Sequence, residues 1–88
     1  MTNELALNTM IISAIAAVAQ TNANLLFSVI HNDDEEENAH YRNILLDNIK
    51  EYLINHYGLD NNDFDDNDIL DILFNNEDEF TVFALNTF

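Results

Sequence analysis

The stretch MIISAIAAVAQTNANLLFSVI, residues 10–30, decides the fold of this chain, because it is the apolar centre of the longest run without Asp, Glu, Lys or Arg, residues 5–32. Its apolar side chains, with Leu7 just before it, recur at spacings of three and four residues, which is the period of one helix face. That stripe consists of Leu7, Ile11, Ala14, Ile15 and Val18. The pattern predicts a helix that builds the hydrophobic core.

The rest of this predicted helix is also apolar or small, so it has no obvious solvent face. A helix that is hydrophobic nearly all round is buried on more than one side. In a chain of 88 residues, a second copy would supply the missing partner, and we expect a homodimer formed through this N-terminal apolar helix. Thr2 or Asn3 would cap the helix, with Glu4 in its first turn. The segment 21–24, Thr-Asn-Ala-Asn, either ends the helix or lies within a longer one that reaches Ile30.

Proline is absent and Gly58 is the only glycine, which favours helices elsewhere. A second amphipathic helix is predicted over about 38–57, with Gly58 in the position of a C-terminal glycine cap. A short helix fits 66–74. The tail from Glu77 has both a helical stripe and a strand-like alternation of apolar residues, and helix is preferred. We therefore predict a single domain over residues 1–88, an all-α bundle of three to four helices that forms a dimer. The alternative is an α+β fold with a C-terminal strand.

The chain contains seventeen acidic residues and two basic ones, so its formal charge is −15. Only Glu4 is acidic before residue 33. The other sixteen form the candidate partner-binding set, which consists of Asp33, Asp34, Glu35, Glu36, Glu37, Asp47, Glu51, Asp60, Asp63, Asp65, Asp66, Asp68, Asp71, Glu77, Asp78 and Glu79. Such a surface repels nucleic acid and anionic membrane and attracts basic protein grooves.

The N-terminal apolar stretch does not match a secretory signal or a membrane anchor. No Lys or Arg precedes Arg42, so a positively charged flank is missing. Polar residues at 20–22 and 24 interrupt the stretch near its middle. We expect a cytoplasmic protein without a membrane partner.

Several kinds of chemical site fit the sequence poorly. An EF-hand loop begun at Asp63 has Asp68 in place of the required glycine and Phe74 in place of the terminal glutamate. The three histidines lack the spacing of a metal site, and no cysteine is present. The carboxylates lie in solvated runs rather than in a shielded cleft that could tune their pKa values. We expect no metal, no cofactor and no enzymatic activity.

The segment from Ile49 to Phe74 resembles the first helix and following loop of acyl-carrier proteins, with an acidic loop before an Asp-Ile-Leu-Asp-Ile-Leu run. That family attaches its prosthetic arm to the serine of an Asp-Ser-Leu motif. This chain has no serine after Ser28. The attachment chemistry is therefore excluded.

The spacing of the acids suggests a different role. Carboxylates three or four residues apart on a helix lie about 5–6 Å from each other, close to the separation of successive phosphates. Asp47 with Glu51, and Asp65 with Asp68 and Asp71, have this spacing. In size, acidity, lack of cysteine and scarcity of basic residues the chain resembles the DNA-mimic proteins that phages use against restriction or CRISPR systems. That resemblance implies an inhibitor.

Three functions stay open on the sequence. The first is a DNA mimic, an anti-restriction or anti-CRISPR type of inhibitor that occupies the basic groove of a host nuclease or another DNA-binding protein without binding nucleic acid itself. The second is an acidic immunity protein or antitoxin that neutralises a basic toxin through an apolar hot spot with acid at its rim. Exposed aromatic side chains would mark that hot spot, and the candidates are Phe64, Phe74, Phe80 and Phe88. The third is a structural or regulatory subunit.

Overall fold

The computed structural model describes residues 4–87 as five helices without a strand. The helices are α1 (Glu4–Thr21), α2 (Ala23–His31), α3 (Glu35–Tyr57), α4 (Asp66–Asn75) and α5 (Glu77–Thr87). The all-α prediction is confirmed, with one helix more than the upper bound of four. The caps predicted at Thr2 or Asn3 lie outside the described residues, as does Phe88.

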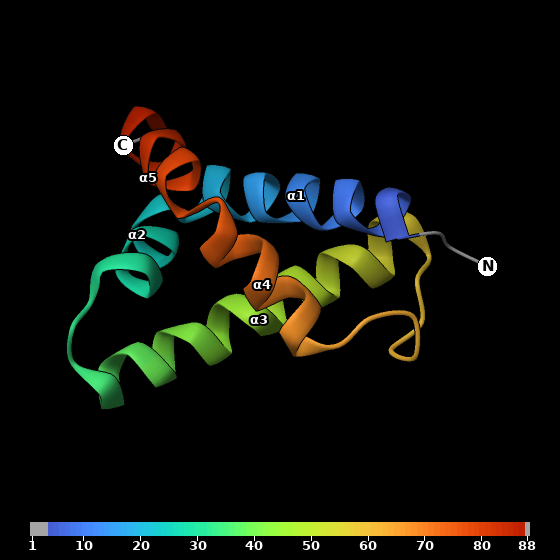
Figure 1. Ribbon diagram of the computed structural model, residues 1–88, viewed down its shortest axis with the longest axis horizontal. Helices are drawn as coiled ribbons and strands as arrows, with labels where there is room; N and C mark the ends of the chain where they lie inside the picture. Colours follow the sequence, from blue (N-terminus) through green and yellow to red (C-terminus); the bar gives the residue numbers. More distant parts are fainter. Residues whose placement is uncertain (1–3, 88) are drawn as a thin grey trace.

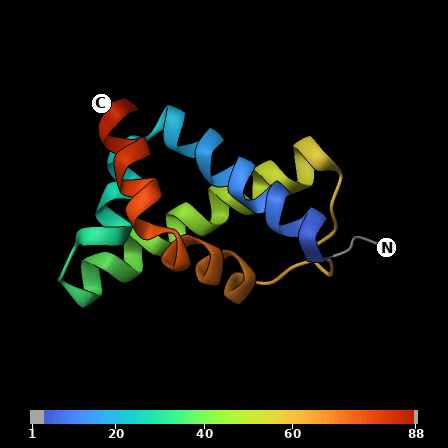
Figure 2. The same cartoon turned by 45° about the horizontal axis from the view of Figure 1, so that its top comes forward.

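The longest helix, α3, spans the molecule, and α1 lies across it (Figures 1 and 2). Helices α2 and α5 pack against each other at one end, and α4 packs against α1 and the start of α5. The residue-58–65 loop connects the far end of α3 to α4. All four other helices contact α1, so the N-terminal helix is the centre of the core, as its sequence pattern predicts.

The core joins side chains from all five helices. From α1 it takes four of the five residues of the predicted stripe, and the fifth, Leu7, packs against it partly buried. The fully buried large side chains are Ile11, Ile15, Leu26, Val29, Leu45, Ile49, Leu53, Ile69 and Leu73. No polar or charged side chain is buried among the described residues. The homodimer stays a prediction, and the burial of α1 does not require one, because helices of the same chain cover it on several sides.

The question left open at residues 21–24 has a clear answer in the structure. The helix ends at Thr21 and a new one begins at Ala23, with a bend of 114° between them. Asn22 caps the new helix, because its side-chain oxygen accepts a hydrogen bond from the Leu25 amide at 3.2 Å. The bend turns the second half of the apolar stretch onto α3 and α5 instead of extending it away from the core.

The other helix boundaries follow their capping residues. Asp34 accepts hydrogen bonds from the amides of Glu36 and Glu37, so α3 begins at Glu35 and not at the predicted Asn38. Gly58 ends α3 with a φ of +70°, in the left-handed region that glycine adopts without strain. Asp65 and Asp68 form a reciprocal capping box at the start of α4.

The C-terminal segment is helical, and the strand alternative is wrong. Three acidic residues occupy the first turn of α5, where the helix dipole favours negative charge. Phe80 and Ala84 are buried four residues apart, and α5 packs on α2 and α1. A strand would have placed Phe80, Val82 and Ala84 on one face, but Val82 is 57% exposed and Phe83 is partly buried against the core.

Asn38 joins two helices through its side chain. Its amide nitrogen donates to the Val29 carbonyl at 2.9 Å and to the Asn32 carbonyl at 3.1 Å, both at the C-terminal end of α2. These carbonyls lack partners within their own helix. Asn38 therefore holds the end of α2 against the first turn of α3.

We expect Asn38→Ala to lower the free energy of unfolding by about 1–2 kcal/mol relative to Asn43→Ala, because it removes two hydrogen bonds of about 0.5–1.5 kcal/mol each. Asn43 is exposed on the same helix, so both variants share the same gain in helix propensity. Urea unfolding followed by circular dichroism at 222 nm measures the difference. Equal stability of the two variants would contradict this role for Asn38.

Candidate functional site

The sixteen acids of the candidate set are fifteen exposed residues and one half-buried residue, Asp68. They belong to α3, α4, the first turn of α5 and the connecting loops. Residues 5–32, which form most of α1 and all of α2, contain none. In Figure 1, α3, the residue-58–65 loop and the start of α4 lie along the lower side of the molecule, with α1 above them. The first turn of α5, with Glu77, Asp78 and Glu79, lies on the side of α1 and α2 instead, so the acids are concentrated on the lower side but are not confined to it.

Ten of these acids lie at helix N-termini, where carboxylates satisfy free amides and complement the helix dipole. They are Asp34, Glu35, Glu36, Glu37, Asp65, Asp66, Asp68, Glu77, Asp78 and Glu79. Their placement stabilises the helices as well as charging the surface. These ten acids were predicted to bind a partner, but their position at a cap or in a first turn is already explained by the stability of the helix.

The other six acids begin no helix. Asp63 accepts a hydrogen bond from the Asp60 amide at 2.8 Å and so shapes the loop. Asp33 precedes the α3 cap, and Asp71 lies beyond the first turn of α4. Asp47 and Glu51 lie in the middle of α3, on the side opposite its buried residues, at a spacing where like charges repel. Asp47 is close enough to Lys50 for its charge to raise the pKa of that ammonium, whereas nothing in the fold accounts for Glu51.

One ion pair connects the acid-bearing elements within the described part of the chain. The ammonium of Lys50 on α3 lies 2.7 Å from an Asp66 carboxylate oxygen on α4. The hydrogen bond to Asp66 raises the pKa of Lys50, and the charges of Asp66 and Asp47 raise it further. The stability that the raised pKa of Lys50 reflects is present at neutral pH and is lost as rising pH passes that raised pKa. Because both side chains are substantially exposed, that contribution is about 0–1 kcal/mol.

The acids form separate groups rather than one continuous row. Asp47 and Asp66 lie on either side of Lys50, so the residue-60–68 block is next to the middle of α3. Glu37 is thirteen residues from Lys50 along α3, a separation of about 20 Å. The first block therefore lies at the opposite end of α3 from the residue-58–65 loop, and a partner would contact the groups at different points.

A hollow at the end of the molecule holds Phe74, the one exposed phenylalanine among the hot-spot candidates that the structure describes. It has a volume of about 540 Å³ and is lined by Val29, Ile30, Asn32, Asp33, Glu35, Asn38, Arg42 and Phe74. Phe74 is 40% exposed, whereas Phe64 and Phe80 are each 6% exposed and belong to the core. The expectation that Phe64 or Phe80 is exposed is therefore wrong, because both fill gaps between helices.

The same end of the molecule is tied together by a contact between α2 and α5. The Nε2 atom of His31 lies 2.9 Å from the Thr81 hydroxyl. That hydroxyl donates its proton to the Glu77 carbonyl at 2.7 Å, so His31 is the donor to Thr81. The contact holds the first turns of α5 next to the end of α2, beside the hollow that contains Phe74.

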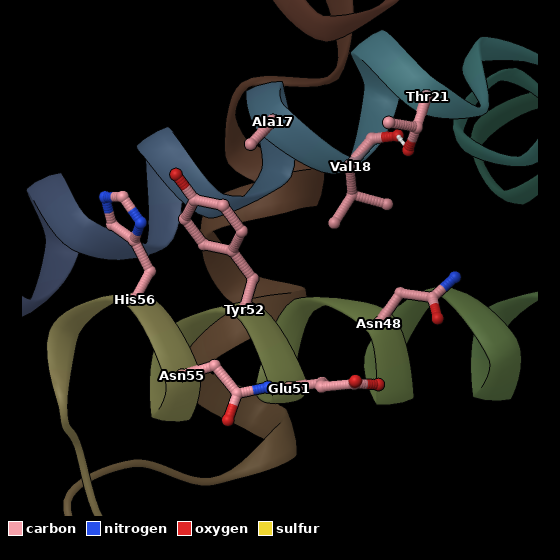
Figure 3. Close-up of a pocket in the computed structure, with 8 residues that line it drawn as sticks. All are labelled: Ala17, Val18, Thr21, Asn48, Glu51, Tyr52, Asn55 and His56. Carbon is pink, nitrogen blue, oxygen red and sulfur yellow. Dashed lines mark hydrogen bonds between the residues drawn. The ribbon is translucent and has the colours of Figure 1, made fainter.

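A second concavity lies between α1 and α3, with a volume of about 530 Å³ (Figure 3). We call it the α1–α3 groove. It is lined by Ala17, Val18, Thr21, Asn48, Glu51, Tyr52, Asn55 and His56. Figure 3 shows Tyr52 pointing from α3 toward α1, between His56 and Val18. Of these residues, only Glu51 is in the partner-binding set predicted from the sequence, because the groove exists only where α1 crosses α3.

No group of three His, Cys, Asp or Glu residues is placed to hold a metal ion in the described part of the chain. No single described helix is both long enough and apolar enough to cross a membrane, although α1 and α2 together pass that test as a bent pair.

A comparison with protein-family models, with curated protein sequences and with solved structures finds no match to this chain. Any statement about function therefore depends on the chemistry of the chain itself.

Neutralising a helix-terminal acid and neutralising a mid-helix acid should change the free energy of unfolding in opposite directions. Glu51→Gln removes a like-charge repulsion and should raise the free energy of unfolding by about 0.2–0.5 kcal/mol. Glu36→Gln makes the same chemical change in the first turn of α3 and should lower it by about 0.3–1 kcal/mol. Urea unfolding at low ionic strength measures both. If the two variants shift stability in the same direction, the division into helix-terminal and other acids is wrong.

Proposed function

We propose that this protein is an inhibitor that occupies the positively charged nucleic-acid-binding groove of another protein. The observation that carries the proposal is the set of exposed acids on α3, α4 and the adjoining loops, compensated among the described residues by one ion pair. A net charge of magnitude about 2–8 is enough to keep a small domain soluble, and −15 exceeds that range. The excess has a cost in self-repulsion, which binding to a basic groove would relieve.

The charge density supports the comparison with nucleic acid. The longest extent of the molecule is 37 Å, over which duplex DNA carries about 22 phosphates at one per 1.7 Å. The chain carries 17 acidic residues, which is the same order. The acids at helix N-termini are anchored by the backbone of folded helices, so the negative array is presented without ordering a flexible segment on binding.

The scarcity of acids in α1 and α2 fits the same function. An inhibitor of this kind needs charged elements for the groove and apolar elements that sustain the fold. Here α1 and α2 supply about half of the buried core residues, and α3, the residue-58–65 loop, α4 and the first turn of α5 carry the charge. The protein offers no base or sugar, so a nuclease that accepts it has nothing to cleave.

The test is capture by the immobilised chain from a lysate of the source cells or their prey, followed by elution with a 20-base-pair duplex DNA. We expect basic nucleic-acid-binding proteins to be released by the DNA and by moderate salt, because both compete for the same groove. Released proteins are identified by mass spectrometry. Captured proteins that added DNA does not displace would contradict the proposal.

A second candidate function is supported by the hollow around Phe74. The exposed Phe74 shares this hollow with Asp33, Glu35 and Arg42. An exposed aromatic side chain with acids near it is the arrangement expected of an immunity protein or antitoxin that binds a basic toxin. In this case one aromatic residue would dominate the affinity, and the acids would act mainly on the association rate.

Substitution of Phe74 separates the two candidates. If the protein is an immunity protein or antitoxin, Phe74→Ala should weaken binding to the captured partner by about 30-fold or more, which is the loss of about 2 kcal/mol of binding free energy expected at a hot-spot residue. For a phosphate mimic the loss should be small, and neutralising Asp47, Glu51 and Asp71 should instead reduce affinity and its dependence on salt. Val82→Ala is the control, since Val82 is 57% exposed on α5. Binding constants from calorimetry at two salt concentrations decide between them.

A further inference from the structure

We infer that the α1–α3 groove is a binding site for an arginine side chain of the basic partner, an inference that rests on the proposed function and assigns it a defined contact. The groove combines an apolar wall, an aromatic ring and a cluster of hydrogen-bond acceptors within about 530 Å³ (Figure 3). These are the three features that an arginine side chain matches, with its aliphatic stem, its planar guanidinium and its five N–H donors.

The acceptors lie on one face of α3. Asn48, Glu51 and Asn55 are spaced at i, i+3 and i+7, so their side chains are neighbours on the helix surface. All three are exposed, and none of their side chains makes a hydrogen bond or ion pair with another described residue. Glu51 is the mid-helix acid that the fold does not explain, and an arginine at this site would give its carboxylate a partner.

The aromatic side of the groove is held by ring contacts. His56 stacks on Tyr52 with ring centroids 4.7 Å apart and planes 18° from parallel. Tyr57 meets both rings edge-on, at 6.1 Å from Tyr52 and 4.9 Å from His56. One face of Tyr52 is thus covered by His56, and the other is available to the groove. A guanidinium over a tyrosine ring gains a cation–π attraction in addition to its hydrogen bonds.

The opposite wall comes from α1. Ala17 and Val18 are small or buried and offer an apolar surface to the arginine stem. The Thr21 hydroxyl donates to the Val18 carbonyl at 2.9 Å, so its proton is already committed and it adds no competing donor. Charge complementarity also selects the occupant, because no lysine or arginine lines the groove and the protein carries a charge of −15. Arginine is preferred to lysine because it binds flat acceptors in pairs and stacks on rings.

The experiment uses N-acetyl-L-arginine methylamide as the probe, titrated into the ¹⁵N-labelled full chain and followed by two-dimensional NMR. We expect saturable shifts at the backbone amides of the groove residues, and no such shifts with the citrulline analogue, which has nearly the same shape without charge. Shifts spread evenly over all the acidic residues, without saturation, would overturn the inference.

Matched variants sharpen the result. Glu51→Gln should weaken probe binding about fivefold or more, whereas Glu36→Gln, which removes the same charge elsewhere on α3, should leave it unchanged. Tyr52→Phe keeps the ring and should keep binding, and Tyr52→Leu should weaken it. Equal effects of the two glutamate variants, or no effect of losing the ring, would overturn the site.

The two proposals fail separately. A chain whose groove ignores the probe can still release basic partners to duplex DNA, which would preserve the proposed function and remove only the arginine site. A groove that binds the probe in a chain whose partners DNA cannot displace would preserve the site and remove the nucleic-acid comparison.

Discussion

The burial of α1 among four other helices of the same chain is the constraint on which the rest of the structure depends. A domain of 88 residues buries only about 60–65% of its unfolded surface, and here it must also overcome the mutual repulsion of a net charge of −15. With neither disulfide nor buried ion pair among the described residues, the apolar contacts of α1 with α2, α3, α4 and α5 supply the main compensation. The bend at Asn22 matters for the same reason, because it folds the second part of the apolar stretch onto the core.

The placement of the acids reconciles the charge with this small core. Most of the candidate acids begin helices, where their carboxylates satisfy free amides and interact favourably with the helix dipole. Their negative charge therefore contributes locally to the stability that it reduces globally. The clearest exception is Glu51 in the middle of α3, whose carboxylate neither caps a helix nor pairs with a described cation. A charge that the fold does not need is better evidence for a binding role than a charge that caps a helix.

The surface offers a partner more than charge. The α1–α3 groove adds a tyrosine ring and unpaired acceptors to the acidic surface, and the hollow around Phe74 places an apolar side chain beside Asp33, Glu35 and Arg42. Charges shared among several sites favour fast association with a basic protein, whereas a defined pocket or an exposed ring gives specificity. An inhibitor that competes with nucleic acid needs both, because charge alone would bind every basic groove.

Sequence alone determined the helical class, the central position of α1, the helix over 66–74 and the glycine at the end of α3, since these depend on periodicity and on local capping chemistry. It also identified every acid of the candidate set, because charge is a property of composition. Only the tertiary structure decided which acids serve helix termini, which phenylalanines are buried and where a groove opens. Phe64 and Phe74 have equal hydrophobicity, and only the packing of α4 leaves one in the core and the other in solvent. The groove depends on where α1 crosses α3, a relation between residues about thirty positions apart that no local pattern contains.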